Sequence, residues 1–85
     1  MGEGFTKGSI RSEIIDIISE NVDVPVAEIK PDSHLVNDLG VESMTFLTII
    51  IGIEDRFDIT IDDDQHGELT TVNAITDFVA GQLGV

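Results

Sequence analysis

The sequence predicts an all-α protein, a small bundle of three main helices and one short helix with a long ordered loop after the first helix. Three observations favour this fold class. Apolar residues recur at helical spacing in three separate segments. Residues that suit a helix start precede or open these segments, and prolines and a glycine interrupt the chain between the first two. Because 41% of the 85 residues are hydrophobic, we expect one domain with one modest core.

The first helix is expected to begin after Ser9, a candidate N-cap, and to end near Asn21. Its apolar side chains recur at i, i+4, i+7 and i+8 and so share one face: Ile10, Ile14, Ile17 and Ile18. Residues 1–8 contain three glycines and no periodic apolar pattern. We therefore expect a flexible leader over residues 1–8 and a single folded domain over residues 9–85.

The segment from Val22 to Val41 cannot continue the helix, because it contains Pro25, Pro31 and Gly40. Loops of this length are commonly either functional or disordered. This one holds several apolar residues that favour an ordered loop packed onto the core: Val24, Val26, Ile29, Leu35, Val36 and Leu39.

The second helix is expected over Met44 to Phe57, where β-branched residues also suit a strand but the length favours a helix. One arc should face the core, and it holds Phe46, Ile49, Ile50, Ile53 and Phe57. A second apolar stripe, expected to be partly exposed, consists of Met44, Leu47 and Ile51. The positions opposite the core arc are Thr45, Thr48, Gly52, Asp55 and Arg56.

After this helix we expect a turn over residues 58–64 and a short helical turn near Gln65 to Leu69. Thr70 or Thr71 then caps a last helix whose apolar face is formed by Val72, Ile75, Phe78 and Val79, with Gly81 and Gly84 at its end. The Asp62–Asp64 run lacks the alternating spacing of a calcium-binding loop, so no dedicated metal site is expected.

Charge and composition restrict the function. With 17 acidic and 4 basic residues the net charge is −13, which argues against nucleic-acid binding and favours partners with basic surfaces. The chain has no cysteine, and no apolar stretch approaches the length of about 20 residues that a membrane span needs. We therefore expect a cytoplasmic protein without a membrane span.

Ser43 lies where the polar loop meets the longest apolar stretch, at the expected start of the second helix. Free backbone N–H groups and the positive end of the helix dipole favour an anion at such a position. The hydroxyl of Ser43 therefore suits an esterified phosphate. It equally suits a simple helix cap, and local chemistry leaves both interpretations open.

The run Asp38-Leu39-Gly40-Val41-Glu42-Ser43-Met44 is similar to the Asp-Leu-Gly-x-Asp-Ser-Leu signature of acyl carrier proteins. Further segments resemble this family in the right order, so that the likeness spans roughly residues 9–83: 10–21, 32–38, 53–61 and 69–79. Two positions of the signature differ, with Glu42 in place of Asp and Met44 in place of Leu. Both differences keep charge or bulk.

The resemblance implies that a phosphopantetheinyl transferase attaches 4′-phosphopantetheine to Ser43, and that the arm holds acyl groups as thioesters. It implies a monomer that delivers acyl groups to acyltransferases, ketosynthases and other enzymes of fatty acid, polyketide or another specialised acyl pathway. The face of the second helix beside the serine is the family's docking surface. The residues expected to recognise partners are therefore Asp38, Glu42, Met44, Leu47, Thr48, Ile51, Glu54 and Asp55.

Thr45 and Thr48 stand where carriers of fatty acid synthesis usually have carboxylates, which favours a specialised pathway. No catalytic set is visible, because Ser43 has no evident base and His34 and His66 fall in loops, where we expect them to be solvated. The chain is therefore not expected to be an enzyme. Two alternatives remain: an unmodified acidic interaction module in which Ser43 only caps the helix, and a peptidyl carrier of nonribosomal peptide synthesis, which the Val41-Glu42 pair fits less well.

Overall fold

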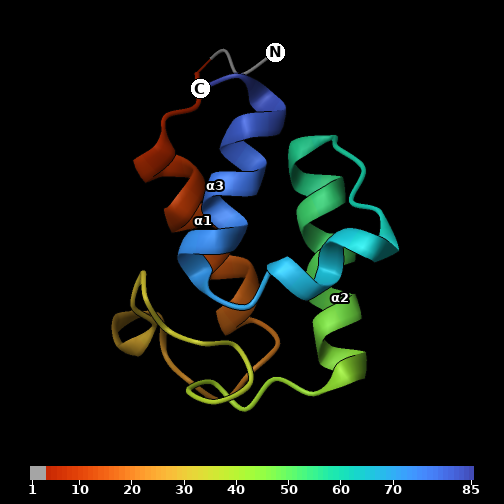
Figure 1. The fold of residues 1–85 in the computed structure, drawn as a ribbon. Coiled ribbons are helices and arrows are strands. Elements are labelled where there is room, and N and C mark those ends of the chain that lie inside the picture. The colour runs from red at the N-terminus through yellow and green to blue at the C-terminus, as the bar shows by residue number, and fades with distance from the viewer. Residues whose placement is uncertain (1–3) are drawn as a thin grey trace.

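The computed structural model describes residues 4–85, and this part of the chain consists of helices and loops without strands. The helices are α1 (Lys7–Ser19), the 3-10 helix η1 (Val26–Glu28), α2 (Ser43–Phe57), the 3-10 helix η2 (Asp63–Glu68) and α3 (Val72–Leu83). Helix α1 packs mainly against α3 and also contacts α2, and the long loop between α1 and α2 closes one end of the bundle (Figure 1). The predicted all-α bundle with three main helices is confirmed.

Helix α1 begins earlier than the sequence pattern predicted. Its N-cap is Thr6, whose Oγ1 accepts a hydrogen bond from the Ser9 N–H at 3.1 Å, while the Ser9 hydroxyl accepts one from the Thr6 N–H at 2.9 Å. The prediction that Ser9 is the N-cap is therefore wrong, and Ser9 is the third helical residue of a reciprocal capping box. The helix ends at Ser19 with Glu20 as C-cap, short of the predicted Asn21.

Part of the predicted flexible leader makes defined contacts. The Phe5 ring packs against Phe57 of α2 with centroids 5.3 Å apart, and the Arg56 guanidinium lies 5.7 Å from the centre of the Phe5 ring. Residues 1–3 of the predicted leader lie outside the described residues. The bundle thus uses the chain from Phe5 onward.

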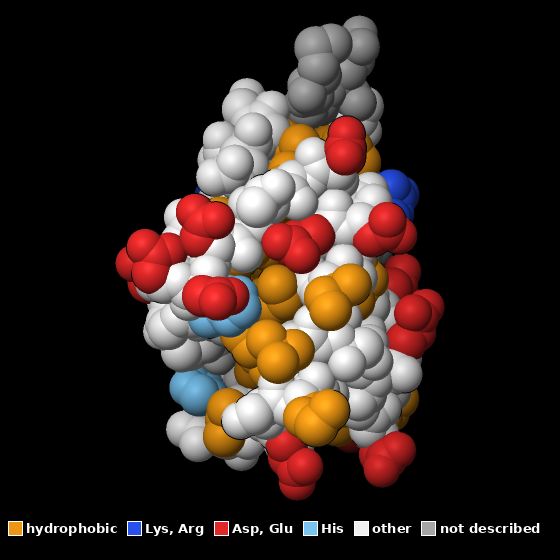
Figure 2. Space-filling model, turned by 90° about the vertical axis from the view of Figure 1, so that its right-hand side faces the viewer, with side chains coloured by type: hydrophobic (Ala, Val, Ile, Leu, Met, Phe, Trp, Pro, Cys, Tyr) orange, Lys and Arg blue, Asp and Glu red, His pale blue; other side chains and the backbone are white. Residues whose placement is uncertain are grey.

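The second apolar stripe of α2, predicted to be partly exposed, is exposed at all three positions. The exposed fractions are 80% for Met44, 48% for Leu47 and 64% for Ile51. Figure 2 views this side of the molecule and shows hydrophobic side chains near the middle of the face with acidic side chains around them. None of the helices within residues 4–85 has the length and hydropathy that crossing a bilayer requires.

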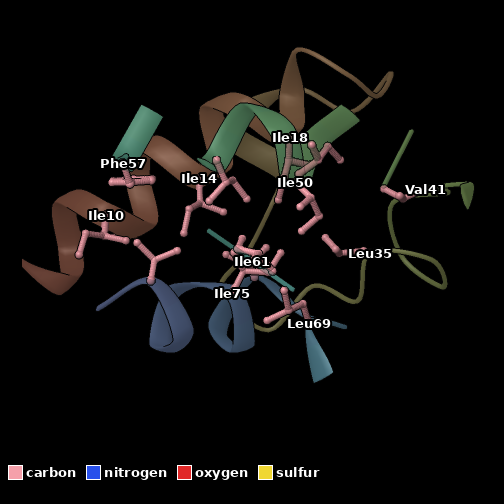
Figure 3. Close-up of a cluster of buried hydrophobic side chains, with 14 of the residues drawn as sticks. Ile10, Ile14, Ile18, Leu35, Val41, Ile50, Phe57, Ile61, Leu69 and Ile75 are labelled. Carbon is pink, nitrogen blue, oxygen red and sulfur yellow. The ribbon is translucent and has the colours of Figure 1, made fainter. Parts of the chain in front are cut away.

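The core is formed by one face of each main helix (Figure 3). Its helical members, all less than a tenth exposed, are Ile10, Ile14, Ile18, Ile49, Ile50, Ile53, Phe57, Val72, Ile75, Val79 and Ala80. The predicted core arc of α2 is confirmed, except that Phe46 is only half-buried. Ile17 and Phe78, predicted on the buried faces of their helices, are also half-buried.

The long loop between α1 and α2 is ordered by apolar contacts with the core. Ile29, Leu35, Leu39 and Val41 are buried, and Val24 is half-buried. The prediction of an ordered loop packed onto the core is therefore confirmed. The prediction that Val26 and Val36 are part of this packing is wrong, because their exposed fractions are 48% and 59%.

Helix α2 approaches α1 closely at Gly52. A Cβ atom added to Gly52 would lie 3.2 Å from Cγ2 of Ile17, so a larger residue at this position would press on α1. Farther along α2, Arg56 forms an ion pair with Glu13 of α1. The sequence placed Gly52 and Arg56 on the outer face of α2, but the structure turns both positions toward α1.

The remaining elements follow the predicted order with shifted boundaries. Helix α2 ends at Phe57, and its C-cap is Asp58, which has a left-handed backbone with φ of 55°. The 3-10 helix η2 begins at Asp63, ahead of the predicted short helix. The Thr71 hydroxyl accepts a hydrogen bond from the Ala74 N–H at 3.0 Å, so Thr71 caps α3 as one of the two predicted candidates. Gly84 ends α3 with φ of 75°, whereas Gly81 lies within the helix.

The core assignment predicts different effects for two isoleucines of the same helix. Ile53→Ala removes a side chain that is 0% exposed, so we expect a loss of about 2–5 kcal/mol in the free energy of unfolding. Ile51→Ala removes one that is 64% exposed and should change that free energy by less than about 0.5 kcal/mol. Urea denaturation followed by circular dichroism measures both, and equal losses would show that the two faces of α2 are wrongly assigned.

Candidate functional site

Ser43 is the first residue of α2 and its side chain is exposed. The N-cap is the preceding residue, Glu42, which has an extended backbone and makes no side-chain cap hydrogen bond. Within residues 4–85 no hydrogen bond to the Ser43 hydroxyl is present, whereas the hydroxyls of Thr6 and Thr71 cap the other two main helices. The structure therefore gives Ser43 no capping role, and its hydroxyl faces solvent at the positive end of the α2 dipole.

The loop before α2 holds this helix start in place through its own backbone. The His34 N–H donates to the Asp38 carboxylate at 2.7 Å, and the Asp38 N–H donates to the His34 carbonyl at 2.8 Å. The Val41 N–H donates to the Leu35 carbonyl at 2.9 Å. Gly40 allows this tight path because its φ is 68°, a conformation that glycine adopts without strain. These hydrogen bonds thus fix the path of the backbone that leads into Ser43.

A second set of backbone hydrogen bonds ties the same loop to the entry of α3. The Leu35 N–H donates to the Thr70 carbonyl at 2.9 Å, and the Asn73 N–H donates to the Pro31 carbonyl at 2.8 Å. Between them, His34 and Thr71 form an isolated antiparallel bridge. These bonds bring three segments that are distant in the sequence to one end of the molecule, namely the loop, the start of α2 and the residues before α3.

A cleft of about 650 Å³ opens where these segments meet, and Ser43 lies on its wall. The lining residues are His34, Leu35, Val36, Val41, Glu42, Ser43, Phe46, Leu47, His66, Leu69 and Thr70. Most of these side chains are apolar, and none of them is a lysine or an arginine. The sequence pointed to Ser43 but gave no sign of the cleft, because no local pattern links residues 34–47 with residues 66–70.

Both histidines line this cleft, and the prediction that they are solvated loop residues is wrong for His66. Its side chain is only 20% exposed, and its ring packs edge-on against Phe46 with centroids 5.4 Å apart. Its Nε2 atom is shielded from solvent and has no hydrogen-bond partner within residues 4–85. The His34 side chain is half-buried, and its Nδ1 accepts a hydrogen bond from the Asn37 N–H at 3.2 Å. Figure 2 shows both imidazoles beside the hydrophobic side chains of this face.

The residues expected to recognise partners fall into two groups. Seven of them are exposed, namely Asp38, Glu42, Met44, Leu47, Thr48, Ile51 and Asp55, and Glu54 is half-buried. Two of the carboxylates accept hydrogen bonds from the backbone: Asp38 from the His34 N–H, and Glu54 from the Ile61 N–H at 2.7 Å. These two side chains therefore have a structural role in addition to any contact with a partner.

The two threonines near Ser43 differ in their surroundings. Thr48 is exposed, and its hydroxyl donates to the Met44 carbonyl at 3.1 Å within α2. Thr45, which the sequence placed on the outer face, is half-buried. No cluster of three or more potential metal ligands occurs in the described part of the chain.

The family model of the phosphopantetheine attachment site matches residues 12–79 of this chain. The chain is 30% identical over 76 residues to acyl carrier proteins of Myxococcus xanthus and Micrococcus luteus, which covers 89% of this chain and 96% and 94% of those proteins. A solved structure of acyl carrier protein from Enterococcus faecalis has the same fold. Its TM-score is 0.76 with 22% sequence identity over 91% of this chain and 98% of that chain.

The absence of a capping role for Ser43 can be tested by stability. Ser43→Ala should change the free energy of unfolding by less than about 0.5 kcal/mol, because no cap hydrogen bond is lost. Thr71→Ala removes the α3 cap and should cost about 0.5–2 kcal/mol. Chemical denaturation of both variants checks this. A Ser43→Ala loss as large as that of Thr71→Ala would mean that Ser43 caps α2 in solution.

Proposed function

The chain belongs to the acyl carrier protein family, whose members carry phosphopantetheine and are not enzymes, and we propose that Ser43 is the attachment residue of its arm. The observation that carries the proposal is the state of the Ser43 hydroxyl. It is exposed, it has no cap hydrogen bond, and it stands at the first position of α2 on the wall of a mostly apolar cleft.

The start of α2 suits a phosphodiester for electrostatic reasons. The first N–H groups of a helix have no partner within it, and the helix dipole favours negative charge beside them. Phosphopantetheine reaches Ser43 from coenzyme A by formation of a bond between Ser43 Oγ and phosphorus. The pyrophosphate bond breaks, adenosine 3′,5′-bisphosphate leaves, and the hydroxyl proton goes to a base of the transferase. The thiol at the end of the arm supplies the sulfur of an acyl thioester.

The exposed stripe of α2 supports a docking role for this helix. Met44, Leu47 and Ile51 present apolar surface close to Ser43, and Glu42 and Asp55 are exposed acidic groups on the same helix region. The family implies a phosphopantetheinyl transferase and acyl-pathway enzymes as partners. We expect their docking surfaces to combine an apolar centre with basic side chains, in keeping with the net charge of −13.

The pathway is proposed to be a specialised one, such as polyketide synthesis, in place of housekeeping fatty acid synthesis. The start of α2 presents Thr45 and Thr48 without a carboxylate between Glu42 and Glu54. A partner whose basic side chains bind carboxylates at these two positions would lack those charge-assisted hydrogen bonds with this chain.

Intact mass measures attachment directly. Wild type incubated with coenzyme A, magnesium and a promiscuous phosphopantetheinyl transferase should gain the mass of one phosphopantetheine group, and Ser43→Ala should gain none. Ser9→Ala is the matched control, because Ser9 is a serine of α1 that lies outside the cleft, and it should load like wild type. No gain with several transferases, or a gain in Ser43→Ala, would contradict the assignment.

The proposed pathway is tested by loading with a malonyl transferase of fatty acid synthesis. Wild-type protein whose arm has a free thiol should be a poor malonyl acceptor, and the double variant Thr45→Asp with Thr48→Glu should raise kcat/KM by about tenfold, because two carboxylates are added at the docking face. A control with the same added charge elsewhere is Ser12→Glu with Thr60→Asp, both at exposed positions. If wild type already loads as well as a housekeeping carrier, the specialised pathway is wrong.

A further inference from the structure

We propose that the cleft beside Ser43 selects uncharged acyl groups that bear an oxygen along the chain beyond the thioester carbonyl, such as a hydroxyacyl chain, and that His66 is the residue that recognises this oxygen. The inference rests on the proposed function, because the acyl group reaches the cleft from an arm on Ser43. To the proposed carrier function, this inference adds the chemical class of the acyl group and the residue that determines specificity for it.

The apolar walls of the cleft determine which kind of acyl chain can bind there. Leu35, Val41 and Leu69 are buried residues of the core, and Phe46 is half-buried beside them. An acyl chain placed against these side chains loses contact with water, which is favourable for each methylene group. The cleft therefore suits a mainly hydrocarbon chain.

The His66 ring also lines the cleft, and it carries a polar atom without a partner. Its Nε2 atom is shielded from solvent and has no hydrogen-bond partner within residues 4–85, and the nearest carboxylate oxygen, Oδ1 of Asp63, is 4.0 Å away. That distance is too long for a hydrogen bond. A buried nitrogen without a partner is unfavourable, so a ligand that supplies a partner gains more than one that does not.

The imidazole of His66 suits a hydroxyl group in either tautomer. A neutral imidazole has one donor and one acceptor nitrogen, and a hydroxyl can accept from the first or donate to the second. The methylene groups of a saturated chain can do neither and leave Nε2 unsatisfied. Because Nε2 is shielded, the oxygen reaches it after a small movement of the His66 and Phe46 rings, which touch edge to face with centroids 5.4 Å apart.

His34 adds a second polar group to the cleft. Its Nδ1 accepts the Asn37 N–H, so the proton of the neutral ring resides on Nε2, which is then a hydrogen-bond donor. Glu42 also lines the cleft, and no lysine or arginine does. A cargo carboxylate would meet negative charge without a fixed cation, and the cleft therefore favours an uncharged oxygen over a carboxylate.

The test compares two cargoes of equal length on wild type and on His66→Phe, which keeps an aromatic ring against Phe46 but removes both nitrogens. Each protein is loaded from hexanoyl- or 3-hydroxyhexanoyl-coenzyme A with a promiscuous transferase, and intact mass confirms loading. The rate of thioester cleavage by hydroxylamine is then measured. Each rate is divided by that of the same acyl group on free pantetheine, which removes the intrinsic reactivity of the thioester.

In wild type, the normalised rate of thioester cleavage should be about 3- to 10-fold lower for the hydroxylated cargo than for the saturated one. This is the factor expected for one hydrogen bond. In His66→Phe the two cargoes should be protected equally. Glu68→Ala is the matched control, because Glu68 is exposed in the same short helix and lies outside the cleft, and it should keep the wild-type ratio.

Two results of the cleavage assay would contradict the proposal. Equal protection in wild type, or an unchanged ratio in His66→Phe, would refute the role of His66.

The ¹⁵N resonances of the His66 ring give a second readout: they should change with the hydroxylated cargo and stay constant in the arm-bearing protein without cargo. The same change without cargo would mean that oxygens of the arm occupy the cleft, which also overturns the proposal. A protein that gains no arm fails at the mass measurement, so failure of the proposed function is recognised separately.

Discussion

The backbone pairing between the long loop and the entry of α3 determines how the segments around Ser43 are arranged. Residues 31–35 exchange hydrogen bonds with residues 70–73 at 2.8–3.2 Å, and Leu35 is buried directly beside this contact. A loop of this length has to satisfy many backbone N–H and C=O groups before it can pack on a core. The pairing does so, and it thereby fixes where α2 starts relative to α3 and where Ser43 stands.

The sequence predicted those parts of the fold that depend on local patterns. The spacing of isoleucines along α1 and α2 was sufficient for the core faces, since burial of a helix face follows directly from its periodicity. The start of α1 was predicted wrongly because a capping box needs the pair Thr6 and Ser9, and Ser9 alone also satisfies the rule for an N-cap. Gly52 was misplaced because its contact with Ile17 depends on how α1 and α2 approach one another, which no single-helix pattern contains.

The candidate site also has one part that a local sequence pattern predicts and one part that depends on contacts between distant segments. The position of Ser43 at the start of α2 was predictable, because it lies in a continuous motif where a polar loop meets an apolar stretch. The cleft was not, because Phe46, His66 and Leu69 come from segments that only the loop pairing brings together. His66 illustrates the difference: its sequence surroundings are acidic and loop-like, yet the fold turns its ring onto Phe46 and away from solvent.

Gly52 has a consequence for the cleft on the other side of α2. A side chain at this position would act as a wedge against Ile17, because even a single methyl group would come within 3.2 Å of it. The opposite face of the same helix carries Phe46 and Leu47, which line the cleft. We therefore expect a larger side chain at residue 52 to change the width of the cleft without altering any residue that lines it.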